Sequence, residues 1–415
     1  MDLLRFTTAG SVDDGKSTLI GRLLYDAKSI FEDQLQAMER STERRGGTGV
    51  DLSLLTDGLQ AEREQGITID VAYRYFATPK RKFIIADTPG HEQYTRNMVT
   101  GASTANLAIV LIDARKGVLT QSRRHAYIAH LLGIPHLIAA INKMDLVDYS
   151  EAVYQSIQTD FSAFCQQLGA RDVRFIPISA LHGDNVVEKS ARMPWYTGDT
   201  LLDTLEGIHI QHDINLRDFR FPVQLVCSPQ ISGLPDFRGY MGRIESGCVR
   251  AGDDIVVLPS GHRSHIKDIV TYDGNLSVAC APQSVTLMLE DHIDISRGDM
   301  IVHPENPPRS AREFHAMLCW MSEQPLHPRG KYLIKHTTHT AKAVVQEIEH
   351  KVDINTLATG PASELKMNEI GRVLIKVQRP VVCDAYRDNR ASGAFIVIDE
   401  HTNNTVAAGM IEGAD

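Results

Sequence analysis

The sequence predicts an α/β domain with a mostly parallel sheet and helices on both faces, followed by two all-β barrel domains. Up to about residue 212, buried-type strand segments alternate with helix-like segments, which is the pattern of βαβ units. Beyond that point short strands recur between glycine-containing turns, which is typical of small β-barrels. We therefore expect domains over residues 1–212, 217–308 and 311–415.

Composition is that of an ordinary globular protein, with 43% hydrophobic and 23% charged residues. A chain of 415 residues exceeds what one hydrophobic core usually holds, which agrees with several domains. The formal net charge of -9 argues against a large nucleic-acid surface, because such a surface normally carries a basic excess. No signal peptide precedes the first strand and no apolar run could span a bilayer, so we expect a soluble cytoplasmic protein.

The cysteines and histidines give no clear metal or disulfide pattern. His262 with His265, or His336 with His339, could pair on a metal, but surface histidines on strands are the commoner case. The cysteines are scattered, without a C-x-x-C pair or a zinc spacing, so we expect reduced thiols in the core. They are Cys165, Cys227, Cys248, Cys280, Cys319 and Cys383.

The first site signal is the segment from Gly10 to Ser17, which fits the phosphate-binding pattern G-x-x-x-x-G-K-[ST]. Glycines let backbone N–H groups approach phosphate oxygens, Lys16 reaches the outer phosphates, and the Ser17 hydroxyl is a ligand for Mg²⁺. A chance match in a glycine-rich turn is the alternative. The apolar strand before the segment and the helix-like segment after it argue against that alternative. The predicted nucleotide contacts here are Gly10, Ser11, Val12, Asp13, Asp14, Gly15, Lys16, Ser17 and Thr18.

Two further segments supply candidates for the metal ion and the terminal phosphate. Thr68 lies where a polar, glycine-rich stretch enters a strand, a position suited to Mg²⁺ and the γ-phosphate, although a plain strand residue is the alternative. Asp87 ends a buried-type strand and can hold Mg²⁺ through water. Gly90 can bring its N–H to a terminal phosphate, and His91 can position the attacking water. The second segment consists of Asp87, Thr88, Pro89, Gly90 and His91.

The base is predicted to bind where the next strands end. Asp145 can accept two hydrogen bonds that guanine donates and adenine does not, while Asn142 would hold the loop and Lys143 would lie along the ring. Such loop residues are common, and it is their place at a strand end that supports the interpretation. Because a mispaired base leaves buried polar groups unsatisfied, a strong preference for guanine is expected. The predicted base contacts are Asn142, Lys143, Met144 and Asp145, with Ser179, Ala180 and Leu181, where a backbone N–H can reach guanine O6.

Together these segments resemble the guanine-nucleotide motifs of GTPases. Residues 62–69 and 87–91 resemble in particular the translation-factor branch, of which elongation factor Tu is the familiar member. The resemblance implies an α/β P-loop GTPase domain with the ligand at the carboxyl ends of the strands, and GTP or GDP with Mg²⁺ as ligands. It also implies that the all-β blocks are a second and a third barrel, on residues 243–253, 297–299 and 371–411.

Longer segments resemble more closely the large-subunit family of bacterial sulfate adenylyltransferase, or ATP sulfurylase. Two differences from elongation factor Tu accompany them: Asp14 stands where that protein typically has histidine, and Thr88 where cysteine is common. The resemblance implies a GTPase in a heterodimer or larger complex. Its GTP hydrolysis would drive formation of adenosine 5′-phosphosulfate and pyrophosphate from ATP and sulfate by a small ATP-binding subunit. The segments are residues 11–24, 56–76, 91–98 and 113–119.

In this interpretation the catalytic residues are Lys16, Thr68, Gly90 and His91. Ser17 and Thr68 hold Mg²⁺ directly, and Asp87 holds it through water. No arginine finger is identifiable, which predicts slow hydrolysis without the partner. The alternatives are a translation factor that carries aminoacyl-tRNA and a regulatory GTPase for another enzyme.

Overall fold

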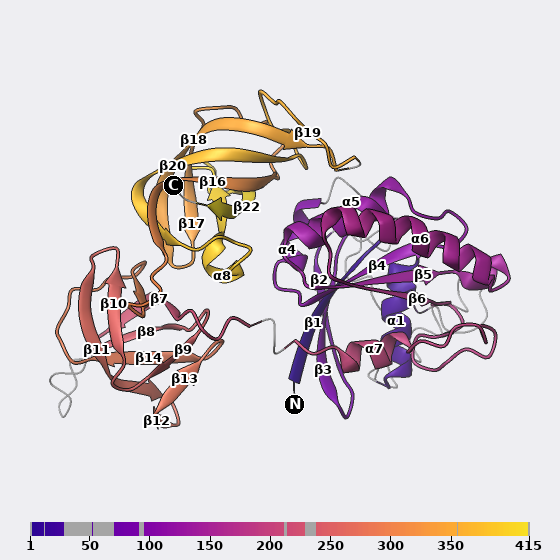
Figure 1. Cartoon of the computed structure of the whole chain (residues 1–415), viewed down its shortest axis with the longest axis horizontal. Helices are drawn as coiled ribbons and strands as arrows, with labels where there is room; N and C mark the ends of the chain where they lie inside the picture. Colours follow the sequence, from indigo (N-terminus) through magenta and orange to yellow (C-terminus); the bar gives the residue numbers. More distant parts are fainter. Residues whose placement is uncertain are drawn as a thin grey trace. The chain divides into compact units, whose positions relative to one another are not determined.

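The structure is a computed structural model that falls into two compact units (Figure 1). The first unit comprises residues 1–210 with 354–356, and the second comprises 211–353 with 357–415. No helix of the described residues is long and apolar enough to cross a membrane. The described residues are 2–11, 13–28, 52, 70–90, 95–210, 214–228, 238–354 and 356–413.

The first unit contains a six-stranded, mostly parallel sheet. Its strands are β1 (Asp2–Ala9), β2 (Ala72–Ala77), β3 (Arg81–Asp87), β4 (Leu107–Asp113), β5 (His136–Asn142) and β6 (Asp172–Pro177). They lie in the order β2-β3-β1-β4-β5-β6, and only the pairing of β2 with β3 is antiparallel. Strand β4 is buried along its whole length and β5 along nearly all of it, which explains their continuous apolar sequences. The sheet confirms the predicted architecture.

Helices cover both faces of this sheet, as predicted. On one face lie α1 (Lys16–Asp26) and α7 (Leu201–Gly207), and on the other lie α4 (Thr95–Ala102), α5 (Thr120–Leu131) and α6 (Glu151–Leu168) (Figure 1). Helix α1 buries Leu19, Ile20 and Leu23 completely against the strands. Helix α6 is capped at both ends: the Ser150 hydroxyl accepts a hydrogen bond from its first turn, and Gly169 ends it with a φ of 76°.

The first barrel lies at the start of the second unit. Its strands are β7 (Arg220–Cys227), β8 (Gly239–Arg243), β10 (Asp254–Leu258), β11 (His262–Thr271), β12 (Gly274–Leu276), β14 (Ser284–Leu289) and β15 (Met300–Val302). They follow the order β10-β15-β7-β8-β14-β11-β12, and an extra pairing of β10 with β11 closes the ring. Two short strands, β9 (Cys248–Arg250) and β13 (Val278–Cys280), form a separate ladder.

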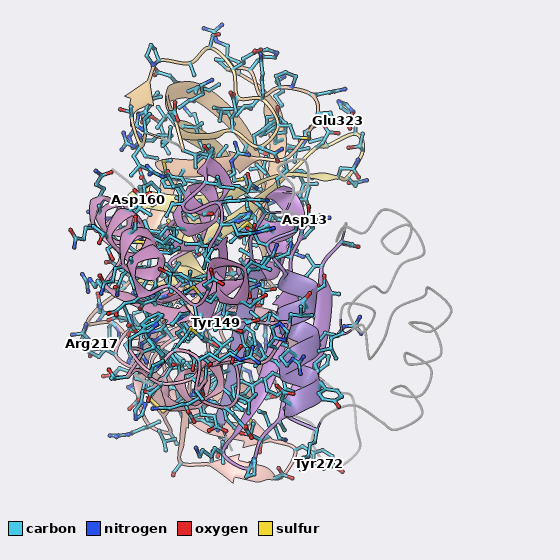
Figure 2. The ribbon with its side chains drawn as sticks, turned by 90° about the vertical axis from the view of Figure 1, so that its right-hand side faces the viewer. Asp13, Tyr149, Asp160, Arg217, Tyr272 and Glu323 are labelled. Carbon is cyan, nitrogen blue, oxygen red and sulfur yellow. A yellow bond between two sulfur atoms is a disulfide. The ribbon has the colours of Figure 1, made fainter. Side chains whose placement is uncertain are left out.

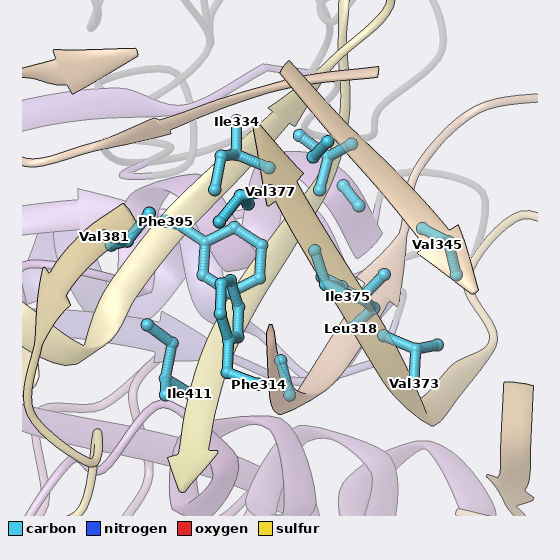
Figure 3. Packing of buried hydrophobic residues seen from close by; sticks show 14 of the residues in the cluster. Phe314, Leu318, Ile334, Val345, Val373, Ile375, Val377, Val381, Phe395 and Ile411 are labelled. Atoms are coloured by element: carbon cyan, nitrogen blue, oxygen red, sulfur yellow. The ribbon is translucent and has the colours of Figure 1, made fainter. Parts of the chain in front are cut away.

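The second barrel fills the rest of the chain. Its strands are β16 (Arg309–Trp320), β17 (Lys331–His336), β18 (His339–Val352), β19 (Thr359–Gly360), β20 (Ile370–Cys383), β21 (Ala394–Ile398) and β22 (Thr405–Gly413), with helix α8 (Arg390–Gly393). The order is β17-β21-β22-β16-β20-β18-β19, and β17 also pairs with β18. Phe314 and Phe395 cross in its core with ring centroids 5.6 Å apart (Figure 3). The two closed rings confirm the prediction of two all-β barrels.

The expectation of scattered, reduced thiols is wrong for two cysteines. Cys248 in β9 and Cys280 in β13 are directly opposite each other in the antiparallel ladder and form a disulfide. They are 32 residues apart in the sequence, so only the strand pairing reveals them as neighbours. Of the remaining cysteines, Cys165, Cys319 and Cys383 are free and buried, as expected.

A buried polar network joins the two barrels within the second unit. Arg220 in β7 is 2% exposed and donates to both carboxylate oxygens of Asp384, at 2.8 and 2.9 Å. It also donates to the carbonyl oxygens of Phe219 and Asn306, at 3.0 and 2.9 Å. Because the guanidinium has an acceptor on every side where it donates, its charge is compensated despite the burial.

Candidate functional site

The predicted phosphate-binding loop connects β1 to α1 at the carboxyl end of the sheet. Asp13 (labelled in Figure 2) and Gly15 have φ angles of 70° and 91°, and left-handed residues of this kind occur in the backbone turns that bind anions. Gly15 precedes α1 and has no side chain that could cap the first N–H groups of the helix. A Cβ on Gly15 would lie 2.5 Å from Asn142 Nδ2, so the position needs glycine for space as well as for backbone conformation.

Lys16 is a buried cation at the start of α1. Its residue is 8% exposed, and its ammonium forms no hydrogen bond or ion pair with the described residues. Burial lowers the pKa of Lys16, while the carboxylates of Asp87 and Asp14 raise it. A buried charge without a close partner is costly, so an anion in the loop would gain the compensation that the protein does not supply.

Asp14 places a buried carboxyl group inside the same loop. One oxygen, Oδ2, accepts the Ser11 N–H at 2.6 Å, and the other, Oδ1, has no partner among the described residues. Burial raises the pKa of Asp14 to about 6, and the nearby charge of Asp113 adds to the rise. The sequence placed Asp14 in the site only as a contact, and nothing in the motif signals that its charge is strongly perturbed.

Asn142 connects the phosphate loop to the predicted base loop. It is 2% exposed, its Nδ2 donates to the Asp14 carbonyl at 2.8 Å, and its Oδ1 accepts the Ala180 N–H at 3.0 Å. The Ala180 N–H, one candidate for the contact with guanine O6, is therefore already bound to protein here. Met144 adds a further tie, because its N–H donates to the Ile178 carbonyl at 3.2 Å.

Lys143 is held over the phosphate loop by two acceptors. Its ammonium donates to the Asp13 carbonyl and, at 3.0 Å, to Asp113 Oδ2. Asp113 ends β4 and also accepts from the Arg115 guanidinium at 3.0 and 2.7 Å. Although burial alone would raise it, these hydrogen bonds from Arg115 and Lys143 hold the pKa of Asp113 well below its usual range. Sequence reasoning did not assign a role to Asp113 or Arg115.

The predicted base loop is anchored on α1 by a residue that the motifs do not include. Arg22 donates to the Ala180 carbonyl at 3.2 Å and to the Leu181 carbonyl. Asp145 lies in the first turn of a 3-10 helix (Met144–Val147), and His182 Nε2 lies 3.9 Å from its Oδ2. Ser179 is fully buried next to this loop. Loop and carboxylate are thus held in fixed positions by the fold.

The carboxyl end of β3 contributes Asp87 and the residues that follow it. Asp87 is 1% exposed, and its Oδ1 accepts the Thr8 hydroxyl at 3.5 Å. The Thr88 hydroxyl donates to the Thr8 carbonyl at 2.7 Å, which fixes β3 to β1 at the level of the loop. Pro89 is buried after it. Asp87 is thereby held at the same edge of the sheet as the phosphate loop.

Gly90 lies directly against the phosphate loop. A Cβ on Gly90 would come within 2.1 Å of the Gly10 carbonyl oxygen and 2.9 Å of Lys16 Nζ. Its carbonyl accepts a hydrogen bond from Gln121 Nε2 at 2.8 Å. No side chain fits at this position without moving backbone atoms, and the predicted sensor of the terminal phosphate therefore has to be a glycine.

The fold brings most of the predicted site residues to one edge of the sheet. Ser17 and Thr18 lie in the first turn of α1, directly after Lys16. Val12, Thr68 and His91 lie outside the described residues, so the roles predicted for them stay predictions. The residues brought together are Gly10, Ser11, Asp13, Asp14, Gly15, Lys16, Ser17, Thr18, Asp87, Thr88, Pro89, Gly90, Asn142, Lys143, Met144, Asp145, Ser179, Ala180 and Leu181.

Comparison with known proteins identifies the family. Residues 1–211 match the elongation factor Tu GTP binding domain, and residues 313–412 match the GTP-eEF1A C-terminal domain-like family. The chain is 58% identical over 412 residues to the sulfate adenylyltransferase subunit 1 of Alteromonas mediterranea, covering 99% of this chain and 87% of that protein. It is 57% identical to the protein of the same name from Bacteroides fragilis, covering 99% and 86%.

A third relative is longer. The chain is 58% identical over 413 residues to a protein of Rhodopirellula baltica named bifunctional enzyme CysN/CysC, covering 99% of this chain and 63% of that protein. The similarity to all three relatives runs through the whole chain, the nucleotide edge of the sheet and both barrels included. The chain belongs to the sulfate adenylyltransferase subunit 1 family, and its α/β unit is a GTP-binding domain.

Proposed function

We propose that this chain is the GTPase subunit of a heteromeric sulfate adenylyltransferase. It binds and hydrolyses GTP, and this hydrolysis drives formation of adenosine 5′-phosphosulfate and pyrophosphate from ATP and sulfate by a small ATP-binding partner subunit. The observation that carries the GTP part is the buried Lys16, which has no hydrogen-bond or ion-pair partner among the described residues and directly follows a turn with two left-handed residues, Asp13 and Gly15. The names of the relatives support the sulfate part and favour it over a carrier of aminoacyl-tRNA.

The phosphate groups of GTP bind in the loop between β1 and α1. Lys16 supplies a positive charge that has no competing partner among the described residues, and the N–H groups at the start of α1 supply donors. Asn142 keeps this loop in register with the base loop, and Asp145 accepts from the guanine edge. Phosphate and base are thus recognised by two loops that one buried amide holds together.

The donors present fit a Mg²⁺ ion. The Ser17 hydroxyl and the Asp87 carboxylate offer the hard oxygen ligands that this ion prefers, and both lie at the carboxyl edge of the sheet. Thr68 is proposed as a further ligand. Bound there, Mg²⁺ offsets the negative charge of the outer phosphates. The carboxylate of Asp87 is buried and lies 3.5 Å from the Thr8 hydroxyl.

Hydrolysis requires groups that stabilise the charge of the transferring phosphoryl group and orient water. Lys16 contributes the positive charge, and the Gly90 N–H contacts the terminal phosphate. His91 orients the attacking water in line with the bond that breaks. Hydrolysis by the isolated chain is slow, and the partner subunit accelerates it. Comparable single-turnover rates with and without the partner would contradict this expectation.

Coupling between the subunits follows from a difference between nucleotide states. The partner must bind the GTP form and the GDP form with different affinity, because a partner with equal affinity for both would shift no equilibrium. Gly90 and Thr68, as contacts of the γ-phosphate, are the residues through which that difference originates. The free energy of GTP hydrolysis then favours the otherwise unfavourable adenylation of sulfate.

The decisive experiment measures pyrophosphate release from ATP by the chain purified with its partner subunit. Release should require sulfate and rise when GTP is present, and a Lys16→Ala complex should lose the GTP effect alone. A complex that binds GTP and releases no pyrophosphate under any condition would overturn the sulfate assignment. Binding of aminoacyl-tRNA on a filter would then identify a translation factor.

A further inference from the structure

Helix α5 reaches Gly90 through Gln121, and the amide of Gln121 also contacts His125 one turn further along the helix. Gln121 Nε2 donates to the Gly90 carbonyl at 2.8 Å and lies 3.2 Å from His125 Nε2. Residues four apart on a helix share a face, so both side chains lie on the face of α5 that reaches Gly90. Neither residue belongs to a nucleotide motif, and the proposed function does not use either of them.

His125 can accept a hydrogen bond from the Gln121 amide. His125 is 1% exposed, and burial lowers its pKa to about 3, with Lys16 and Arg124 lowering it further. A neutral ring that carries its proton on Nδ1 offers the Nε2 lone pair, and this tautomer follows from the amide donor that faces Nε2. The two protons of the Gln121 amide then go to Gly90 and to His125, which fixes the amide in one orientation.

The histidine is retained at some cost. Its Nδ1 has no hydrogen-bond partner in the described part of the chain. An unpaired buried polar atom destabilises the fold, and an apolar side chain of similar shape would avoid that cost. The presence of a histidine here therefore indicates that its other nitrogen, the one that receives Gln121, has a function.

Gly90 is the residue that needs such an anchor. The Gly10 carbonyl and Lys16 Nζ leave no room for a side chain, so the position is restricted to glycine. Glycine, however, is the residue with the widest range of backbone conformations, and its own sterics do not select one. A hydrogen bond to its carbonyl supplies the missing restraint, and Gln121 is the side chain that donates it.

We propose that Gln121, oriented by His125, is a positioning residue for Gly90 and thereby sets how well the chain distinguishes GTP from GDP. The inference rests on the proposed function, in which the Gly90 N–H contacts the terminal phosphate. Gln121 acts through Gly90 and does not itself reach the nucleotide. Loss of Gln121 therefore weakens the binding of GTP, which has a γ-phosphate, and leaves the affinity for GDP unchanged.

The test is a titration of the full-length chain with a fluorescent GDP and with a fluorescent, non-hydrolysable GTP analogue. Gln121→Met keeps the size of the side chain and removes the donor. We expect the Kd for the GTP analogue to rise about tenfold, which corresponds to about 1.4 kcal/mol, while the Kd for GDP changes less than twofold. His125→Leu should shift the same ratio in the same direction by a smaller factor.

The matched control is Gln167→Met, at an exposed position of α6, which should leave both Kd values unchanged. If Gln121→Met does not fold, Gln121→Asn withdraws the amide by one methylene and answers the same question. A ratio of Kd values that stays within twofold of the wild type would overturn the inference. Tighter binding of the GTP analogue to Gln121→Met would overturn the inference too, because Gln121 would then hold Gly90 away from the phosphate. Wild-type chain that binds neither nucleotide would instead refute the proposed function.

Discussion

Lys16 in the α/β unit and Arg220 in the double-barrel unit are both buried cations, and their surroundings are opposite. Arg220 donates to four acceptor oxygens, two of the Asp384 carboxylate and one each of the Phe219 and Asn306 carbonyl groups. Lys16 forms no hydrogen bond or ion pair within the described residues. Burial is nearly the same, at 2% and 8% exposure, so burial alone does not separate a structural charge from a functional one. The number of hydrogen-bond and ion-pair partners separates the two cations.

The buried carboxylates show the same contrast. Both oxygens of Asp384 accept from Arg220, which makes the pair a complete joint between the barrels. Asp14 has one oxygen bonded to the Ser11 N–H and one without a partner in the described part of the chain. In the barrel joint the protein itself compensates both charges, whereas the carboxylate in the nucleotide loop is only partly compensated by the described residues.

The largest effect is expected from Arg220→Met, which tests the barrel side of this comparison. The change leaves the buried Asp384 carboxylate without its counter-charge, and breaking such a pair typically costs about 3–5 kcal/mol. Chemical denaturation should show this loss of unfolding free energy, while the Kd for GTP stays unchanged. Unaltered stability would mean that the network does not hold the barrels together.

Lys16→Met tests the other side and should give the inverse result. Nucleotide affinity should fall about 100-fold, close to 3 kcal/mol, because the charged donor to the phosphates is lost. The stability of the ligand-free chain should stay the same or rise, since a buried charge without a partner is removed. Loss of both stability and binding would show that Lys16 is a structural cation like Arg220.

The comparison also explains how far the sequence could predict the fold. Strands β4 and β5 were evident because their residues are buried on both faces, which gives long apolar runs. Strand β15 has no comparable sequence signal, because its three residues become a strand only by pairing with β7 and β10. In β2 the aromatic Tyr73 and Tyr75 alternate with other residues as in a strand, yet both are exposed, and it is Phe76 on the opposite face that is buried.

The candidate site was predictable where a local pattern encodes it. The phosphate loop and the base loop each form one contiguous segment with fixed residue types, and the fold brings them to one edge. Arg22, Asp113 and Gln121 were not assigned roles, because their contacts depend on strands and helices that are distant in sequence. The disulfide between Cys248 and Cys280 escaped for the same reason.

Gly15→Ala should weaken the site through geometry alone. The φ of 91° is unfavourable for alanine, and the new Cβ would meet Asn142 Nδ2 at 2.5 Å. Strain of this kind costs about 1–3 kcal/mol, so nucleotide binding should fall by roughly one to two orders of magnitude. Gly117→Ala is the control that has the backbone strain without the steric clash, because its φ is also positive and nothing lies within 4 Å of an added Cβ.

Asp14→Asn tests, through the pH dependence of stability, whether the Asp14 carboxylate is less well compensated than that of Asp384. Burial raises the pKa of Asp14 from 3.8 to about 6, so the folded state holds its proton more tightly than the unfolded chain. The stability that this proton contributes is complete below pH 3.8 and is lost as pH rises through about 6. At pH 8 the ionised carboxylate therefore destabilises the fold by about 3 kcal/mol.

The asparagine variant does not ionise and should escape that loss. Its melting temperature should exceed that of the wild type at pH 8, and the difference should shrink toward pH 5. The same titration acts on the ligand, because a neutral group at this position repels phosphate less than a carboxylate does. Equal melting temperatures of the wild type and the variant at pH 8 would show that the Asp14 carboxylate has a partner there and is compensated as well as that of Asp384.

Arg22→Ala is expected to have the smallest effect, because it removes a support of the base loop and no contact with the nucleotide. Arg22 donates to the carbonyl groups of Ala180 and Leu181, and it is partly exposed, so each bond contributes about 1 kcal/mol or less. Affinity for GTP should fall about threefold to tenfold. The triphosphate of 2-aminopurine riboside, which lacks the O6 acceptor that the loop at residues 179–181 is predicted to contact, should lose less than GTP does. An equal loss for both nucleotides would mean that Arg22 supports the phosphate helix and leaves the base loop unaffected, which would place it with the structural cations.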